Sequence, residues 1–137
     1  MNESGEEYLE ALWLLKEKGV KLCRIKDIAE ILDVQPPSAV EMLRKLERNE
    51  FVEYKRQKGV LLTEKGMNRA REIIRAHRLM EVLLNKVIKI DKENIEEIAC
   101  SCEHLLTGEI AMKVCTFLNH PRVCPHGNVI PKGECCP

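Results

Sequence analysis

Two adjacent prolines in the N-terminal half of the chain limit sharply how that half can fold. Pro36 and Pro37, in "QPPS", cannot continue the helical pattern of "IKDIAEILDV", because proline lacks the backbone N–H that a helix interior needs. A proline can occupy the first turn of a new helix, which the apolar spacing of "PSAVEMLRKLERNEF" predicts. We therefore expect two helices joined by a tight turn.

A β-hairpin is predicted directly after these helices. The stretch "FVEYKRQKGVLLT" has two β-prone runs around a polar turn that contains a glycine. An earlier amphipathic helix is predicted between Ser4, as its N-cap, and Gly19. Helix, tight turn, helix and hairpin is the order of a winged helix-turn-helix, whose second helix enters the major groove and whose hairpin touches the DNA backbone.

The charge distribution favours a nucleic-acid partner for this segment. The 137-residue chain has a formal net charge of zero, but residues 20–75 hold 13 basic and 9 acidic side chains, a net charge of +4. Candidate contacts to base edges or phosphates lie on the second helix of the helix-turn-helix, at its start, at the hairpin tip and just before the helix "IKDIAEILDV". These candidates are Arg24, Gln35, Pro37, Ser38, Glu41, Arg44, Lys45, Lys55, Arg56 and Lys58. The alternative is a protein-interaction module whose charged helix face is only solvated.

The remainder of the chain is predicted to be helical up to an irregular tail. Helical patterns cover residues 64–87 and 91–106, and Thr107 caps another helix, while "PRVCPHGNVIPKGECCP" is rich in proline, glycine and cysteine. We expect a mainly α protein: a winged helix-turn-helix domain at residues 1–72, made of three helices and a β-hairpin wing, and an all-helical domain at residues 73–137.

The sequence favours a cytoplasmic protein with reduced thiols. No apolar run approaches the roughly 18 residues that a membrane span needs, and the start "MNESGEEYLE" is acidic where a secretory signal is basic. Seven cysteines are an odd number for a disulfide scaffold. Some of these thiols are therefore expected to be metal ligands.

The stretch "EEIACSCEHLLTGE" concentrates potential metal ligands on one helix. Helical spacing places Glu96, Cys100, Glu103 and His104 on the same side, where a thiolate, carboxylates and an imidazole can chelate a divalent transition metal. Two further pairs have a helical spacing that allows chelation: His77 and Glu81 are four residues apart, and Glu7 and Glu10 are three apart. The alternative is that the acids solvate helix faces and that Cys100 is a small buried apolar group. No HExxH helix, Gly-rich phosphate loop or Ser/His/Asp order indicates an enzyme.

Over nearly its whole length the chain resembles the diphtheria-toxin-repressor and manganese-transport-regulator family of metal-dependent transcriptional repressors. The resembling segments are "YLEALWLL", "PPSAVEMLRKLERNEFV", "LTEKGMNRAREIIRAHRLMEVLL", "EEIACSCEHLLTGEIA" and "CPHGNVIP". The combination of AHRLxExxL with CxxEH is specific to the family. Larger members continue into an SH3-like domain near the point where this chain stops, so we expect no such domain here.

The resemblance implies two neighbouring metal sites. One would use Glu7, Cys100, Glu103 and His104, with Glu10 taking part as in the manganese-type branch, and the other would use His77, Glu81 and Glu96. The iron-type branch typically has Met at the position of Glu7 and His at that of Glu96, whereas the manganese-type branch has Glu at that of Cys100. The sulfur ligand favours Fe²⁺, and the additional carboxylates keep Mn²⁺ as the alternative.

The expected function is that of a homodimeric repressor that binds double-stranded operator DNA when it holds Fe²⁺ or Mn²⁺, with no organic substrate and no membrane partner. Ile110, Val114 and Phe117 form an apolar stripe that is a candidate for the dimer contact. Two alternatives stay open: a thiol-redox-responsive regulator, and a metal-buffering or hydrolase module that does not bind DNA.

The cysteine-rich tail suggests an additional metal site. Cys124, His126, Cys135 and Cys136 supply the donor types of a structural zinc site or an iron–sulfur centre. The alternative is a frayed tail with free thiols.

Overall fold

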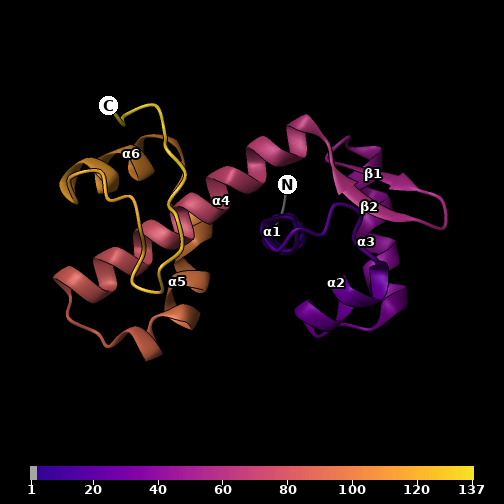
Figure 1. The fold of residues 1–137 in the computed structure, drawn as a ribbon, viewed down its shortest axis with the longest axis horizontal. Helices are drawn as coiled ribbons and strands as arrows, with labels where there is room; N and C mark the ends of the chain where they lie inside the picture. Colours follow the sequence, from indigo (N-terminus) through magenta and orange to yellow (C-terminus); the bar gives the residue numbers. More distant parts are fainter. Residues whose placement is uncertain (1–2) are drawn as a thin grey trace. The chain divides into compact units, whose positions relative to one another are not determined.

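The computed structural model describes residues 3–137, which form two compact units divided between Arg71 and Glu72. The first unit comprises, in chain order, α1 (Glu3–Glu17), α2 (Ile25–Leu32), α3 (Pro36–Arg48), β1 (Val52–Lys55), β2 (Gly59–Leu62) and the start of α4 (Glu64–Val82). The second comprises the rest of α4, the π-helical turn η1 (Leu83–Val87), η2 (Lys92–Asn94), α5 (Glu96–Cys102), η3 (Glu103–Leu105), α6 (Gly108–Phe117) and an irregular tail (Figure 1). The predicted mainly α fold, with a winged helix-turn-helix and a helical domain, is confirmed.

The turn between α2 and α3 forms where the prolines require it. Asp33 ends α2 in the left-handed conformation, with φ of 53°, and the Val34 N–H donates to the Ala29 carbonyl at 2.9 Å. Pro36 then opens α3 in its first turn. The buried side of α3 is formed by Ala39, Leu43 and Leu46. Val40, predicted to belong to that seam, is only partly buried, because it lies one residue around the helix from the buried line.

The hairpin is an antiparallel pair with Val52 opposite Leu62 and Lys55 opposite Gly59. Cys23 joins its edge as a single bridge, since Cys23 and Val60 exchange backbone hydrogen bonds of 2.8 Å in both directions. Gly59 permits this approach: its φ is +136°, and a Cβ there would lie 2.7 Å from the Cys23 carbonyl oxygen. Cys23 thus holds β2 close to the turn of the hairpin, and residues 56–58 of that turn are exposed as the tip of the wing.

The second unit is built around the C-terminal half of α4, whose residues 73–82 are all buried. One side contributes Ala76 and Met80, together with Leu84 of η1, to an apolar cluster with α5. Another side contributes Leu79 and Val82 to a second cluster with α6 and the tail. Because the helix is enclosed on both sides, its polar side chains are buried too and need partners within the protein.

Three helix boundaries differ from those predicted. Ser4 lies inside α1 and is therefore not its N-cap. The helix predicted over residues 64–87 is α-helical only to Val82 and ends in the π-helical turn η1, and the helix predicted over residues 91–106 is divided into η2, α5 and η3. These helical segments are only 3 to 5 residues long, which is too short for sequence periodicity to distinguish them from an α-helix. Among the described residues, every helix is too short or too polar to span a lipid bilayer.

Candidate metal centre and DNA-binding surface

The imidazole of His77 lies at the centre of three carboxylates in the second unit. Its Nδ1 is 2.7 Å from Glu103 Oε2, and its Nε2 is 3.4 Å from Glu96 Oε1 and 3.6 Å from Glu81 Oε2. His77 and Glu81 are on α4, Glu96 begins α5 and Glu103 begins η3. Glu81 and Glu103 are each only 1% exposed, whereas the side chain of Glu96 is 69% exposed. The structure therefore brings together the predicted ligands His77, Glu81 and Glu96.

These carboxylates hold a positive charge on the imidazole. Burial alone lowers the pKa of His77, but hydrogen bonds with Glu103 and Glu81 and the negative charges of Glu103 and Glu96 outweigh it and raise this pKa to about 11. Burial likewise raises the pKa of Glu81, but the hydrogen bond and charge of His77 outweigh it and lower that pKa to about 2. The carboxylates around His77 thus create a negative electrostatic environment that favours a positive charge.

Glu103 also faces the thiol and the second imidazole of the CxxEH segment. Its Oε1 lies 3.5 Å from His104 Nε2 and 3.9 Å from Cys100 Sγ, while its Oε2 faces His77. Both Cys100 and His104 are half-buried. Sulfur, nitrogen and carboxylate oxygen are ligands that Fe²⁺ and related divalent ions accept. The donor chemistry of these residues fits a divalent transition metal, with the Glu103 carboxylate at the centre of the set.

His126, predicted as a ligand of a separate tail site, is a neighbour of the His77 cluster through Glu81. Its Nδ1 lies 2.6 Å from Glu81 Oε2, and its Nε2 donates to the Lys92 carbonyl at 2.8 Å. Cys124 joins Glu81 and His126 in a group whose donor atoms lie within 4.8 Å of one another. Burial lowers the pKa of His126, but the Lys92 carbonyl and the Glu81 charge outweigh it and raise that pKa. Nothing in the spacing of residues 81 and 126 signals this contact.

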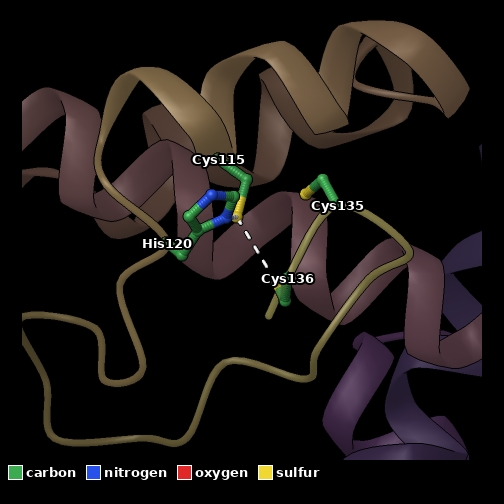
Figure 2. Close-up of side chains that lie close together, drawn as sticks. All are labelled: Cys115, His120, Cys135 and Cys136. Atoms are coloured by element: carbon green, nitrogen blue, oxygen red, sulfur yellow. Dashed lines mark hydrogen bonds between the residues drawn. The ribbon is translucent and has the colours of Figure 1, made fainter.

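The four residues predicted as a tail site are divided between two groups. Cys124 and His126 lie with Glu81, whereas Cys135 and Cys136 lie with Cys115 and His120 (Figure 2). Cys115 and His120 stand five residues apart at the end of α6, a spacing that could have marked them as a pair.

The remaining predicted ligands, Glu7 and Glu10, lie on α1 in the first unit. They are three residues apart and both are half-buried. Their positions on one helix agree with the spacing argument, and their role is taken up below with the proposed function.

All ten candidate DNA contacts in the first unit are exposed. Gln35 precedes α3 as its N-cap, and the exposed side chains of Ser38 and Arg44 on α3 lie away from the buried face that contains Leu43. The wing tip presents Arg56 to solvent, and Gln57 there has a φ of 63°. This arrangement has the two parts of a winged helix-turn-helix interface: a polar recognition helix and a basic wing.

Two family models match consecutive parts of the chain. The model described as iron dependent repressor, N-terminal DNA binding domain, matches residues 1–60. The model described as iron dependent repressor, metal binding and dimerisation domain, matches residues 63–132. Together they cover the winged helix-turn-helix and most of the helical unit.

Individual relatives agree with this assignment. An uncharacterised HTH-type transcriptional regulator of Methanocaldococcus jannaschii is 30% identical over 118 residues, which are 86% of this chain and 94% of that protein. The iron-dependent repressor IdeR of Mycobacterium tuberculosis is 35% identical over 134 residues, which are 96% of this chain and 58% of that protein. The chain thus spans little more than half of IdeR.

A solved structure described as the manganese regulator SloR superimposes with a TM-score of 0.82 at 38% identity, covering 93% of this chain and 59% of that one. Iron and manganese are therefore both represented among the relatives. The family is one of transcriptional repressors and not of enzymes. This chain belongs to the iron-dependent repressor family of metal-dependent transcriptional regulators.

Proposed function

We propose that this protein is a metal-dependent transcriptional repressor, a homodimer that binds operator DNA more tightly when it holds a divalent metal ion and so regulates genes of metal homeostasis. The observation that carries the proposal is the cluster around His77, where the buried carboxylates of Glu81 and Glu103 converge on one imidazole. Burying several carboxylates together is unfavourable unless a cation neutralises them. Repression of a gene requires the protein to reach the DNA, and we infer that it acts in the cytoplasm.

We assign the metal ligands to two neighbouring sites. Cys100, Glu103 and His104 form one set, supported by the distances of the thiol and the imidazole from Glu103 Oε1. His77, Glu81 and Glu96 form the other, supported by their mutual proximity. We add Glu7 and Glu10 to the first set, and this part of the assignment rests on the family resemblance. A bound ion would supply the positive charge that the proton on His77 supplies in its absence.

Fe²⁺ is the ion that we propose, with Mn²⁺ as the alternative. The Cys100 thiol is a soft ligand and favours Fe²⁺, whereas the surrounding carboxylates are hard ligands that Mn²⁺ accepts equally well. A titration that compares the two ions in the wild-type protein and in a Cys100→Glu variant measures this preference. We expect the variant to bind Mn²⁺ better than the wild type relative to Fe²⁺.

DNA recognition is assigned to α3 and the wing. The exposed polar side chains of α3 would read base edges in the major groove, and Lys55, Arg56 and Lys58 would contact phosphates. For the dimer contact we propose Ile110 and Phe117, which are 55% and 70% exposed. Val114, the third member of the predicted stripe, is partly buried against both apolar clusters of the second unit, which favours a role in the core.

Linkage between metal and DNA provides the test. DNA ligands are first selected from a random duplex library with Fe²⁺ under anaerobic reducing conditions, and their affinity is then measured by fluorescence anisotropy with Fe²⁺, with Mn²⁺ and with chelator. We expect metal to raise the affinity by about 5- to 150-fold, the usual range of such coupling. The His77→Ala variant should lose this response and keep its basal affinity. Cys102→Ser, a half-buried thiol outside the donor groups, is the matched control.

An affinity that is the same with metal and with chelator would contradict the proposal. An affinity that ignores metal but changes on oxidation would support a thiol-redox switch instead.

A further inference from the structure

The end of the chain forms a second donor group that the proposed repressor function does not use. Cys115 lies in the last turns of α6, His120 follows that helix, and Cys135 and Cys136 come from the terminal turn (Figure 2). Their four donor atoms lie within 4.8 Å of one another. Cys115 Sγ is 3.4 Å from His120 Nδ1 and 3.7 Å from Cys136 Sγ.

The backbone explains how these four side chains meet. After α6, Asn119 and His120 both adopt left-handed conformations, with φ of 62° and 52°, and the His120 N–H donates to the Cys115 carbonyl at 2.8 Å. This turn brings the imidazole back beside the Cys115 thiol. The tail is attached to α4 by Arg78, whose Nη1 donates to the Val129 carbonyl at 2.6 Å. A turn in which the Cys136 N–H donates to the Gly133 carbonyl at 3.1 Å then presents two consecutive thiols.

We propose that Cys115, His120, Cys135 and Cys136 bind one Zn²⁺ ion in a closed, structural site. Three sulfurs and one imidazole are a complete ligand set for tetrahedral zinc. With Zn–S of about 2.3 Å and Zn–N of about 2.0–2.1 Å, tetrahedral edges are about 3.8 Å between two sulfurs and about 3.6 Å between sulfur and nitrogen. The observed 3.7 Å and 3.4 Å are close to these edges.

The compactness of the group favours a single ion over an iron–sulfur cluster. In a four-iron cluster each protein ligand binds a different iron, so the ligands stand around a larger body than one metal ion. Here all four donor atoms fall within 4.8 Å, a separation that suits ligands of one central ion. Zinc also differs from the ion proposed for the His77 cluster, where carboxylates predominate.

Two arginines supply the charge that such a site needs around it. Three thiolates and one Zn²⁺ would carry a net charge of −1. Arg75 Nη2 donates to Cys135 Sγ at 3.2 Å, and Arg122 Nη2 donates to Cys136 Sγ at 3.2 Å. Gly133 leaves space for the first of these contacts, because a Cβ there would lie 2.4 Å from the guanidinium carbon of Arg75. Outer partners of this kind orient and stabilise metal ligands.

The thiols also differ in how firmly they hold their protons. Burial raises the pKa of Cys136, but hydrogen bonds from the tail turn, Cys115, His120 and Arg75 outweigh it and lower this pKa to about 6. Burial and hydrogen bonds with the neighbouring thiols raise the pKa of Cys115 to about 11. Metal ions bind deprotonated thiols, so zinc binding to these cysteines should release protons.

The proposed ion would join the tail to the end of α6 and, through Arg75, to α4. A structural zinc stabilises the folded state by binding ligands that are brought together only there. This inference is independent of the proposed repressor function, because its ligands and its test do not involve DNA.

The test is a zinc titration of the full-length chain. It is carried out in a His77→Ala background, which reduces zinc binding by the His77 cluster. Purified protein is dialysed against zinc under reducing conditions, and bound metal is measured by mass spectrometry. Co²⁺ substitution gives a second readout, because thiolate ligands produce charge-transfer absorption and tetrahedral cobalt has intense visible bands. We expect one Zn²⁺ per chain in the parent.

Cys135→Ser and Cys136→Ser are the variants of choice, since both thiols are only half-buried at the edge of the second apolar cluster. Each should weaken zinc binding by about 100-fold or more, the upper end of the loss seen when only an outer partner is removed. Cys102→Ser should bind zinc like the parent. Circular dichroism of each variant establishes that it is folded.

Three outcomes would overturn the proposal. They are a parent that binds no tightly held zinc, serine variants that retain the parent's stoichiometry, and a protein that instead holds iron with stoichiometric acid-labile sulfide.

Discussion

The two units of this protein differ in where their charged side chains lie. In the first unit the buried residues of α2 and α3 are apolar and the charged side chains face solvent; the buried Glu6 is paired with Arg69 at 2.7 Å. In the second unit the central stretch of α4 buries two arginines, a histidine and a glutamate, and η3 buries a further glutamate. One unit has an ordinary core, and the other has a core that includes ionisable groups.

This contrast separates folding from regulation. An apolar core is stabilised by removing surface from water and needs no bound ion. A core with buried carboxylates is stable only while cations compensate them, so its free energy of unfolding depends on what occupies the sites. Under the proposed function, the second unit is where a change in metal concentration would alter the protein, and the first is where a stable surface would meet DNA.

The largest effect that sharpens this contrast is expected from the core of the first unit. Leu43 is fully buried on α3, and Leu43→Ala should lower the free energy of unfolding by about 2–5 kcal/mol, through lost burial and the cavity left behind. Urea unfolding followed by the fluorescence of Trp13, the only tryptophan, measures it. The loss should be the same with metal and with chelator. Arg48→Ala, on the exposed side of the helix, should change stability by no more than about 0.5 kcal/mol.

If the destabilisation by Leu43→Ala depends on metal, the stability of the first unit is not independent of metal binding.

The next effect is expected from the ionisable core. His77→Ala removes the imidazole that Glu81 and Glu103 share, and it should lower Mn²⁺ affinity by about 100-fold, or about 2.7 kcal/mol. Isothermal titration calorimetry measures it. Glu103→Gln, which preserves the side-chain volume but removes its charge, should also weaken binding, and Cys102→Ser should not. Unchanged affinity in both cluster variants would show that the ligands lie elsewhere.

A smaller effect is expected from the charged surface of the first unit. Arg56→Ala and Lys58→Ala should each reduce the slope of log affinity for DNA against log salt by about 1, because each removes one phosphate contact. Anisotropy titrations at several salt concentrations measure the slope. Lys86→Ala, an exposed cation of the second unit, serves as the control. If Lys86→Ala alters the slope as much as the wing variants do, the DNA-binding surface is not confined to the first unit.

The smallest effect is expected at the tail. Gly133→Ala should push the Arg75 guanidinium away from Cys135 and weaken Zn²⁺ binding by about 10-fold, while metal-dependent DNA binding stays unchanged. Competition with a chromophoric zinc chelator measures the change. Glu134→Ala, an exposed neighbour, is expected to match the wild type. If Gly133→Ala binds zinc with wild-type affinity, Arg75 does not contribute to the site.

Much of the first unit follows from local signals in the sequence. The proline pair places the turn before α3, and the β-prone runs around the polar turn "KRQKG" predict the hairpin. The exposed and buried faces of α3 follow from helical periodicity, apart from the exchange of Val40 for Ala39 in the buried line. Each of these features depends on residues that are close in the chain.

The metal cluster could be predicted only in part. His77 and Glu81 meet because they are four residues apart on one helix, and the spacing of Cys100, Glu103 and His104 likewise places them near one another. That His77 lies against Glu103, 26 residues away, depends on how α4 packs against α5 and η3. The contact of His126 with Glu81 depends on the path of the irregular tail, which has no periodicity to read.

The sequence by itself determined the order of helices and hairpin, the surface offered to DNA and the ligand pairs on single helices, because short-range periodicity and turn chemistry encode these features. Tertiary structure alone decided which groups share a site. It separated Cys124 and His126 from Cys135 and Cys136, and it joined the terminal pair to Cys115 and His120. The physical reason is that donors distant in sequence meet only when apolar packing fixes the path of the chain between them.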